Sequence, residues 1–289
     1  MATTYRWTGS TSEDWGTPAN FNPNPATVPL TGDSVICGSE ATRGISVNID
    51  RTGDANGINT GLNLVLFEIE KGFNFNIGSS ATPLKLTADK FVDRGGGELY
   101  FTSVTGTALE VTDLLVIDKD NIGKIVVIGS ISNTGGAPWP ATITRADIMR
   151  SANITIGGTI TTLYITPRTG PFDVNAIWAP DNQGAMTIYM AGGTLYAEGT
   201  EGVASTIYLS GGSLEHDAQT GGSIGTLFQF GGMVLMSNGI ITSYRALGGF
   251  MDSTGIGGNK TITALIRGPG FDYARNPKLT ITTETILGD

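Results

Sequence analysis

A unit of about 20 residues recurs in the last third of the chain and limits the folds that it can adopt. Residues 187–195 (TIYMAGGTL), 206–214 (TIYLSGGSL) and 226–234 (TLFQFGGMV) align without gaps, at spacings of 19 and 20 residues. One such unit holds two or three short strands and is too small to bury its own apolar side chains. Stacked units, by contrast, join their backbones into parallel ladders around one continuous core.

The repeat therefore predicts an all-β chain folded as a parallel β-helix, or β-solenoid, with rungs of about 20 residues. In each unit a Gly-Gly pair supplies a tight corner or a positive φ without steric cost. Because side chains alternate along a strand, we expect Ile188, Ile207 and Leu227 to stack in one inward column. A β-sandwich with a chance recurrence of Gly-Gly is the rival fold.

The chain divides by regularity into three segments. Residues 151–289 carry the regular repeats. Residues 41–150 contain short strand-like runs at less even spacing, so the solenoid is expected to extend across them with less uniform rungs. Residues 1–40 have a different composition and are expected to form an N-terminal cap or attachment segment.

Two loops interrupt the repeats, and each carries a tryptophan among prolines: Trp139 lies within residues 133–140 and Trp178 within residues 171–180. The prolines keep these segments out of central strands. A tryptophan on such a loop either covers the flank of the solenoid or anchors a partner. Both tryptophans are therefore candidate partner contacts.

The first 40 residues contain a series of short elements: W-x-G at 7–9, a second tryptophan, N-F, V-P, and an aspartate three residues before an isoleucine. This series resembles the opening motif of many bacterial and phage β-helix proteins. The resemblance implies a cap in which aromatic rings cover the open end of the first rung, where unpaired backbone would otherwise invite aggregation. Trp7 and Trp15 carry the motif, and they are also candidate partner contacts.

Candidate catalytic groups are sparse. Glu215-His216-Asp217 is the one place where the single histidine meets carboxylates, and adjacent strand residues point to opposite faces. The single cysteine, Cys37, lies in an apolar run and is expected to be a buried, inert thiol. Acids that recur at the rung spacing could flank a sugar as glycosidase carboxylates do, and two such pairs exist: Glu198 with Asp217, and Asp181 with Glu201.

Other ligand-binding motifs are incomplete. Residues 118–123 (DKDNIG) begin like a calcium loop but lack its later glutamate, which favours a plain turn. One histidine and one cysteine do not provide a zinc ligand set. We therefore expect no catalytic residues, no metal and no cofactor, and the chain is interpreted as a protein that is not an enzyme.

The charge distribution argues against nucleic acid as a partner. The formal net charge is −9, and residues 169–244 contain no Lys or Arg to neutralise phosphates. No apolar run approaches the length of a membrane span. The N-terminus lacks the basic and apolar regions of a secretory signal, so we expect synthesis in a host cytoplasm without export.

The resemblance and the missing signal together favour a bacteriophage structural protein on the virion surface, with a capsid decoration (cement) or head-fibre role. We expect its partners to be the major capsid protein or other virion proteins, and we expect a homo-oligomer, most simply a trimer. The alternative function is a phage tailspike or receptor-binding β-helix that binds or cleaves host surface polysaccharide. An adhesin fragment ranks third.

Overall fold

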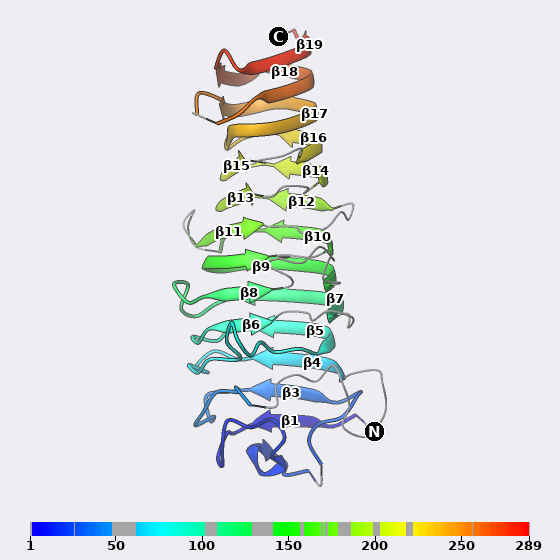
Figure 1. The fold of residues 1–289 in the computed structure, drawn as a ribbon, viewed down its shortest axis with the longest axis vertical. Coiled ribbons are helices and arrows are strands. Elements are labelled where there is room, and N and C mark those ends of the chain that lie inside the picture. Colours follow the sequence, from blue (N-terminus) through cyan, green and yellow to red (C-terminus); the bar gives the residue numbers. More distant parts are fainter. Residues whose placement is uncertain are drawn as a thin grey trace.

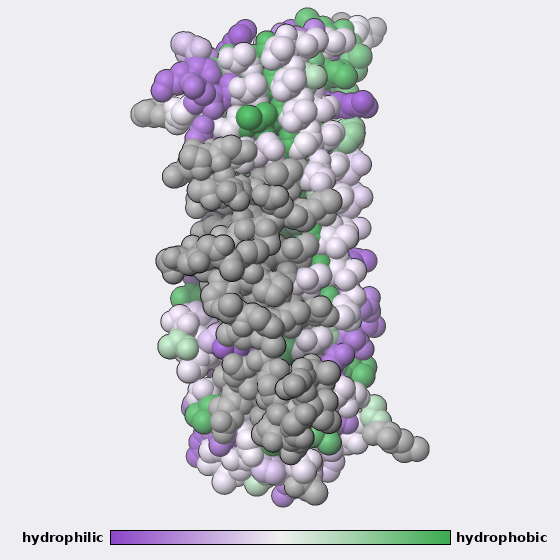
Figure 2. Space-filling model, turned by 45° about the vertical axis from the view of Figure 1, so that its right-hand side comes forward, coloured by the Kyte–Doolittle hydropathy of each residue, from purple (hydrophilic) through white to green (hydrophobic). Residues whose placement is uncertain are grey.

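The chain forms an elongated stack of strands with its termini at opposite ends (Figure 1), and the space-filling view shows the same elongated shape (Figure 2). The computed structural model describes residues 2–25, 27–47, 62–101, 109–128, 141–156, 159–168, 170, 173–178, 186–198, 203–217, 222–255 and 257–288. All the strands belong to one sheet, and neighbouring rungs pair in parallel throughout, apart from one antiparallel pair at the N-terminus. The predicted all-β parallel solenoid is confirmed.

The elements follow one another around the stack in sequence order. They are β1 (Thr4–Trp7), the 3-10 helix η1 (Pro18–Asn20), β2 (Phe21–Asn22), β3 (Ser34–Cys37), β4 (Asn63–Ile69), β5 (Thr87–Asp93), β6 (Leu99–Phe101), β7 (Leu109–Asp118), β8 (Val126–Ile128), β9 (Ala141–Ile156), β10 (Thr159–Ile165), β11 (Val174–Trp178), β12 (Thr187–Met190), β13 (Thr194–Glu198), β14 (Val203–Leu209), β15 (Ser213–Asp217), β16 (Ser223–Gln229), β17 (Met233–Asp252), β18 (Lys260–Ala274) and β19 (Leu279–Ile286).

Two walls face each other across the core. The first wall contains β3, β4, β5, β7, β10, β12, β14 and β16, and the second wall contains β6, β8, β11, β13 and β15 (Figure 1). The longer strands β9 and β17 contribute to both walls, because β9 pairs with β10 and then with β11, while β17 pairs with β15 and then with β16. A rung is thus one strand segment from each wall joined by corners.

The predicted inward column is present. Ile188, Ile207 and Leu227 are register partners on β12, β14 and β16, and all three side chains are fully buried. The same column continues in both directions without a break, through register partners Tyr5, Val35, Phe67, Phe91, Leu115, Ala146 and Leu163 below and Tyr244 and Leu265 above. One ladder therefore joins the three segments that the sequence distinguishes.

The Gly-Gly corners of the regular rungs are as tight as expected. The second glycine of each pair has a positive φ, which is +74° at Gly193, +84° at Gly212 and +72° at Gly232. A Cβ atom added at Gly212 would lie 2.4 Å from the carbonyl oxygen of Gly193 in the rung below. Glycine is thus required at Gly212 for two reasons, the positive φ and the close stacking of rungs.

An aromatic cluster lies at the N-terminal end, as the fold prediction required. The ring of Phe21 packs edge-on against Trp7 and Trp15, with centroid distances of 5.2 and 5.5 Å. Trp15 also stacks on Phe67, the ring of the inward column in β4, at 6.0 Å. The antiparallel pairing of β1 with the short β2 brings Phe21 over this end, so the aromatic cluster joins the first rung to the core.

Candidate interaction surface

The outer face of the first wall carries a ladder of stacked aromatic rings. Tyr164, Tyr189, Tyr208 and Phe228 are register partners on β10, β12, β14 and β16. Successive ring centroids are 4.9 Å apart, with interplanar angles of 11°, 5° and 5°. The rings point outward because their neighbours in each strand, such as Ile188 and Met190, point into the core.

Arginines close both ends of this aromatic ladder. The guanidinium of Arg145 lies 4.6 Å from the ring centroid of Tyr164, and that of Arg245 lies 5.5 Å from the centroid of Phe228. Every ring face in the ladder is therefore covered by another ring or by a cation. The ladder presents ring edges and tyrosine hydroxyl groups to its surroundings, and it holds no open ring face for a ligand.

A column of hydroxyl side chains runs beside the aromatic ladder. Its members are register partners and all are half-buried: Thr162, Thr187, Thr206, Thr226 and Ser243. Together the two columns make a regular, uncharged face, which fits the absence of Lys and Arg from residues 169–244. Such a face is suited to polar and apolar protein contacts with little dependence on salt.

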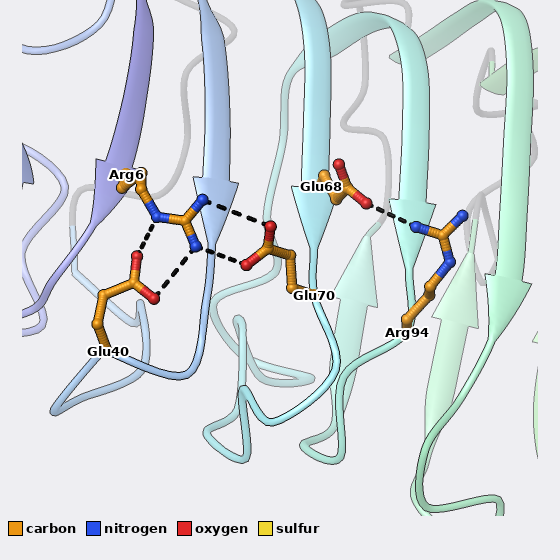
Figure 3. A network of polar contacts seen from close by, with 5 residues as sticks. All are labelled: Arg6, Glu40, Glu68, Glu70 and Arg94. Carbon is orange, nitrogen blue, oxygen red and sulfur yellow. Dashed lines mark hydrogen bonds and ion pairs between the residues drawn. The ribbon is translucent and has the colours of Figure 1, made fainter.

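The outer surface of the N-terminal rungs is held by ion pairs instead. Arg6 on β1 pairs with Glu40, and its Nη2 lies 2.5 Å from Oε2 of Glu70 at the end of β4 (Figure 3). Arg94 Nη1 lies 2.6 Å from Oε1 of Glu68 in the same region. Both glutamates raise the pKa of Arg6. These pairs link different rungs on the outside, as the ring stack does in the C-terminal half.

A buried ion pair lies inside the N-terminal half. Nζ of Lys119 lies 2.9 and 3.0 Å from the two carboxylate oxygens of Asp93, and both side chains are excluded from solvent. Burial raises the pKa of Asp93, while Lys119 and the backbone N–H of Gly95 oppose that rise. The predicted turn at residues 118–123 thus holds a core cation. Among the described residues no group of three acidic, histidine or cysteine side chains could hold a metal.

The Glu215-His216-Asp217 sequence divides between the two sides of the second wall. His216 points inward, between its register partners Ala197 and Met236. Within the described part of the chain, neither ring nitrogen makes a hydrogen bond of normal geometry. Burial lowers the pKa of His216 to about 4, and the Ile240 backbone and Asp217 oppose this shift. The two carboxylates alternate with it and are half-buried. The histidine and the acids therefore do not form a catalytic group.

The acid pairs that follow the rung spacing have different outcomes. Glu198 and Asp217 are register partners at the ends of β13 and β15, so their backbones lie side by side on neighbouring rungs. Asp181 and Glu201 lie outside the described residues.

Cys37 is fully buried and burial raises the pKa of its thiol, which agrees with the inert role expected from its sequence context.

The four tryptophans expected to contact partners also differ. Trp7 and Trp15 are fully buried in the core, and Nε1 of Trp7 donates to the carbonyl oxygen of Arg43. Partner contact does not fit this placement, because neither ring has exposed surface, and both instead join the aromatic cluster. Trp139 lies outside the described residues, and Trp178 is placed only by its backbone in β11.

Sequence reasoning missed the outer columns, although their signal was present. Each regular unit begins Thr-x-Tyr or Thr-x-Phe, and the alternation that places the middle residue inward places the other two outward.

Comparison with family models, with curated proteins and with solved structures finds no significant match to this chain. None of the described helices has the length and apolar character needed to span a bilayer.

Proposed function

We propose that this protein is a non-enzymatic structural component of a bacteriophage particle, where it decorates or stabilises the capsid surface through protein–protein contacts. The proposal is supported by the unbroken inward column from Tyr5 to Leu265, which makes the chain one continuous stack rather than a set of separately moving domains. A stack of this kind suits a spacer or surface element, because each rung is tied to the next by backbone ladders.

The uncharged outer face of the first wall supports the same proposal. The regular Thr and Tyr columns offer a surface of repeating chemistry, and the covered ring faces leave shape and edge contacts as the means of attachment. In this proposal the protein forms a homo-oligomer, most simply a trimer on a particle symmetry axis, and it binds the major capsid protein. Its site of action is the virion surface.

The experiment identifies the chain in purified particles by mass spectrometry and measures its copy number. Trp139→Ala with Trp178→Ala then tests the loops that are expected to attach it, and Phe230→Ala, which removes an exposed ring at a corner, is the control. We expect the double variant to lose oligomer mass by light scattering, and retention on particles, while the control keeps both. Absence of the chain from particles would contradict the proposal.

A second candidate function is cleavage of host surface polysaccharide, and the register of Glu198 and Asp217 is the observation that favours it. Strands in a sheet lie about 4.8 Å apart, which is close to the separation of the two carboxyl groups in retaining glycosidases. Release of reducing ends from capsule or lipopolysaccharide, abolished by Asp217→Asn, would establish this function in place of the structural one.

A further inference from the structure

The second wall has two hollows on its outer face, and they share the same chemistry. The first has a volume of about 410 Å³ and is lined by Glu13, Ser46, Phe75 and neighbouring residues that include Asn74 and Asn76. The second has a volume of about 270 Å³ and is lined by Ala152, Asn153, Ile154, Asn175 and Tyr196. Each hollow thus combines one aromatic ring with two asparagine side chains.

The first hollow holds its ring and one amide in fixed positions. Phe75 packs edge-on against the buried Phe73 at 5.7 Å, yet 37% of it remains exposed. Oδ1 of Asn76 accepts the backbone N–H of Glu98 at 2.9 Å. Asn74 is exposed, and no hydrogen bond of its side-chain amide is found within the described part of the chain. The hollow therefore offers an accessible ring beside two amides, one oriented by the backbone of Glu98 and one exposed.

A β-bulge shapes the second hollow. Val174 pairs with Ser151, but Ala176 pairs with Ile154, so β9 has one extra residue opposite Asn175. A bulge bends its strand and redirects side chains, and bulges are frequent beside binding sites. Here Asn153 and Asn175 are both exposed, and neither amide has a hydrogen bond to any residue that the structure describes. Tyr196, on the next rung, completes the hollow.

The two hollows lie in line along the axis of the solenoid. Their rungs are connected by the register partners Ile77, Leu99, Val126 and Ile154, which are three steps apart. At about 4.8 Å for each step, the separation is roughly 14 Å. Tyr100, next to Leu99 and half-buried, lies on the wall between them. A linear ligand laid along the second wall would therefore reach both hollows.

The lining residues define the ligand class. An amide carries donors and an acceptor side by side, which match neighbouring hydroxyl groups, and an exposed ring accepts an apolar face. Neither hollow is lined by Lys or Arg, and Glu13 lines the first, so an anionic ligand is disfavoured. We propose that the second wall binds a neutral oligosaccharide along the solenoid axis, with the two hollows as subsites.

This proposal goes beyond the structural role and does not rest on it. It also requires no cleavage, although the register partners Glu198 and Asp217 lie on the same wall beyond Tyr196. A protein that attaches to particles without binding sugars would contradict only the glycan proposal. A protein that binds sugars but is absent from particles would contradict only the proposed function.

The test titrates the full chain with neutral hexasaccharides (cellohexaose, maltohexaose and chitohexaose) and with hexagalacturonate as the acidic probe. Binding is measured by saturation-transfer NMR and calorimetry. We expect one or more neutral hexasaccharides to bind, and the matching disaccharide to bind at least tenfold more weakly because it is too short to occupy both subsites. No binding of any neutral hexasaccharide at millimolar concentration, or preferred binding of hexagalacturonate, overturns the proposal.

Variants assign the binding to the hollows. Phe75→Ala, and Asn153→Ala with Asn175→Ala, should each weaken binding at least tenfold at unchanged melting temperature. The controls are Phe250→Ala, whose ring has the same 37% exposure but lies on later rungs, and Asn63→Ala, an exposed asparagine at the start of β4. Both controls should bind like the unchanged protein. Equal loss in the controls, or no loss in the hollow variants, overturns the assignment.

Discussion

The two halves of the solenoid place their aromatic rings on opposite sides of the same wall. In the N-terminal half the rings lie inside: Phe67 stacks on Phe91 at 5.0 Å, and Phe91 contacts Phe101 across the core at 4.4 Å. In the regular rungs of the C-terminal half the same column holds Leu163, Ile188, Ile207 and Leu227, and the tyrosines stack outside at 4.9 Å. Both halves keep the parallel rung spacing, because the backbone ladder sets it.

This difference shows that ring stacking and core filling are separable in a β-solenoid. The two-glycine corner with a positive φ recurs at Gly193, Gly212 and Gly232, on the rungs whose inward column is aliphatic, and again at Gly249 beside the buried Tyr244. Each half also buries polar groups: Asp93 and Lys119 pair in the first half, and in the second half Gln229 Nε2 donates to the carbonyl oxygen of Gly232.

Removal of one ring from each half tests the comparison most directly. Phe91→Ala should cost about 3–5 kcal/mol in the free energy of unfolding, because it leaves a cavity in the core. Tyr208→Ala removes only exterior stacking and should cost about 1 kcal/mol. Urea denaturation followed by circular dichroism measures both. Equal losses would mean that the outer ladder is as important to stability as the core.

The buried ion pair provides the next test. Lys119→Met leaves the Asp93 carboxylate buried without a cation and should cost about 3 kcal/mol at pH 7. Because burial raises the pKa of Asp93, a lower pH protonates that carboxyl in the folded protein, and the cost of the variant should shrink. Urea midpoints at pH 7 and pH 5 measure this change.

A surface pair is the matched control for the ion pair. Lys90 lies 3.4 Å from Asp113 with both side chains more than half exposed, so Lys90→Met should cost well under ~1 kcal/mol. Asp93→Leu combined with Lys119→Met should recover much of the lost stability, since it removes both charges. A double variant no better than Lys119→Met would contradict the assignment to an unpaired charge.

The buried histidine His216 should give an effect of similar size that depends on pH. The pKa of His216 is about 4 in the folded protein and 6.5 as the ordinary value, so the unfolded state binds the proton more readily. Stability should therefore fall as pH falls from 6.5 towards 4, by up to roughly 3 kcal/mol. Asp217, the charged group that acts on His216, is retained in the His216→Met variant, which should lose this part of the pH dependence. An identical pH profile in the variant would contradict this role.

The regular half of the fold could be predicted from sequence because its units align without gaps. That alignment fixed which residues are register partners, and alternation then placed Ile188, Ile207 and Leu227 in one inward column. The inward position of His216 was not predicted. The partner role of Trp7 and Trp15 did not fit, because the motif that contains them places both rings in the core. The burial of Lys119 was also unpredictable, since it follows directly after a strand in a segment that is typical of an exposed turn.

There is a different reason why the candidate sugar site could not be predicted from the sequence. Its second hollow depends on the bulge opposite Asn175, and one extra residue in β9 changes which side chains become neighbours. The spacing of repeats in the sequence does not reveal such a bulge. The first hollow depends on isolated bridges at Ile45 and Ile77 rather than on a repeated unit, so its residues come from segments without a common pattern.

The glycine corners also determine how a chain of this kind can grow through gene duplication. A Cβ at Gly212 would clash with Gly193 below, and a Cβ at Gly232 would lie 2.6 Å from the carbonyl oxygen of Gly212. In the regular rungs each corner therefore lies directly against the backbone of the corner beneath it, and only glycine at the upper corner leaves room for that contact. A duplicated stretch such as residues 206–225 carries its own corner and can be inserted between its neighbours, whereas a partial copy cannot. Gene duplication would therefore lengthen such a stack by whole rungs.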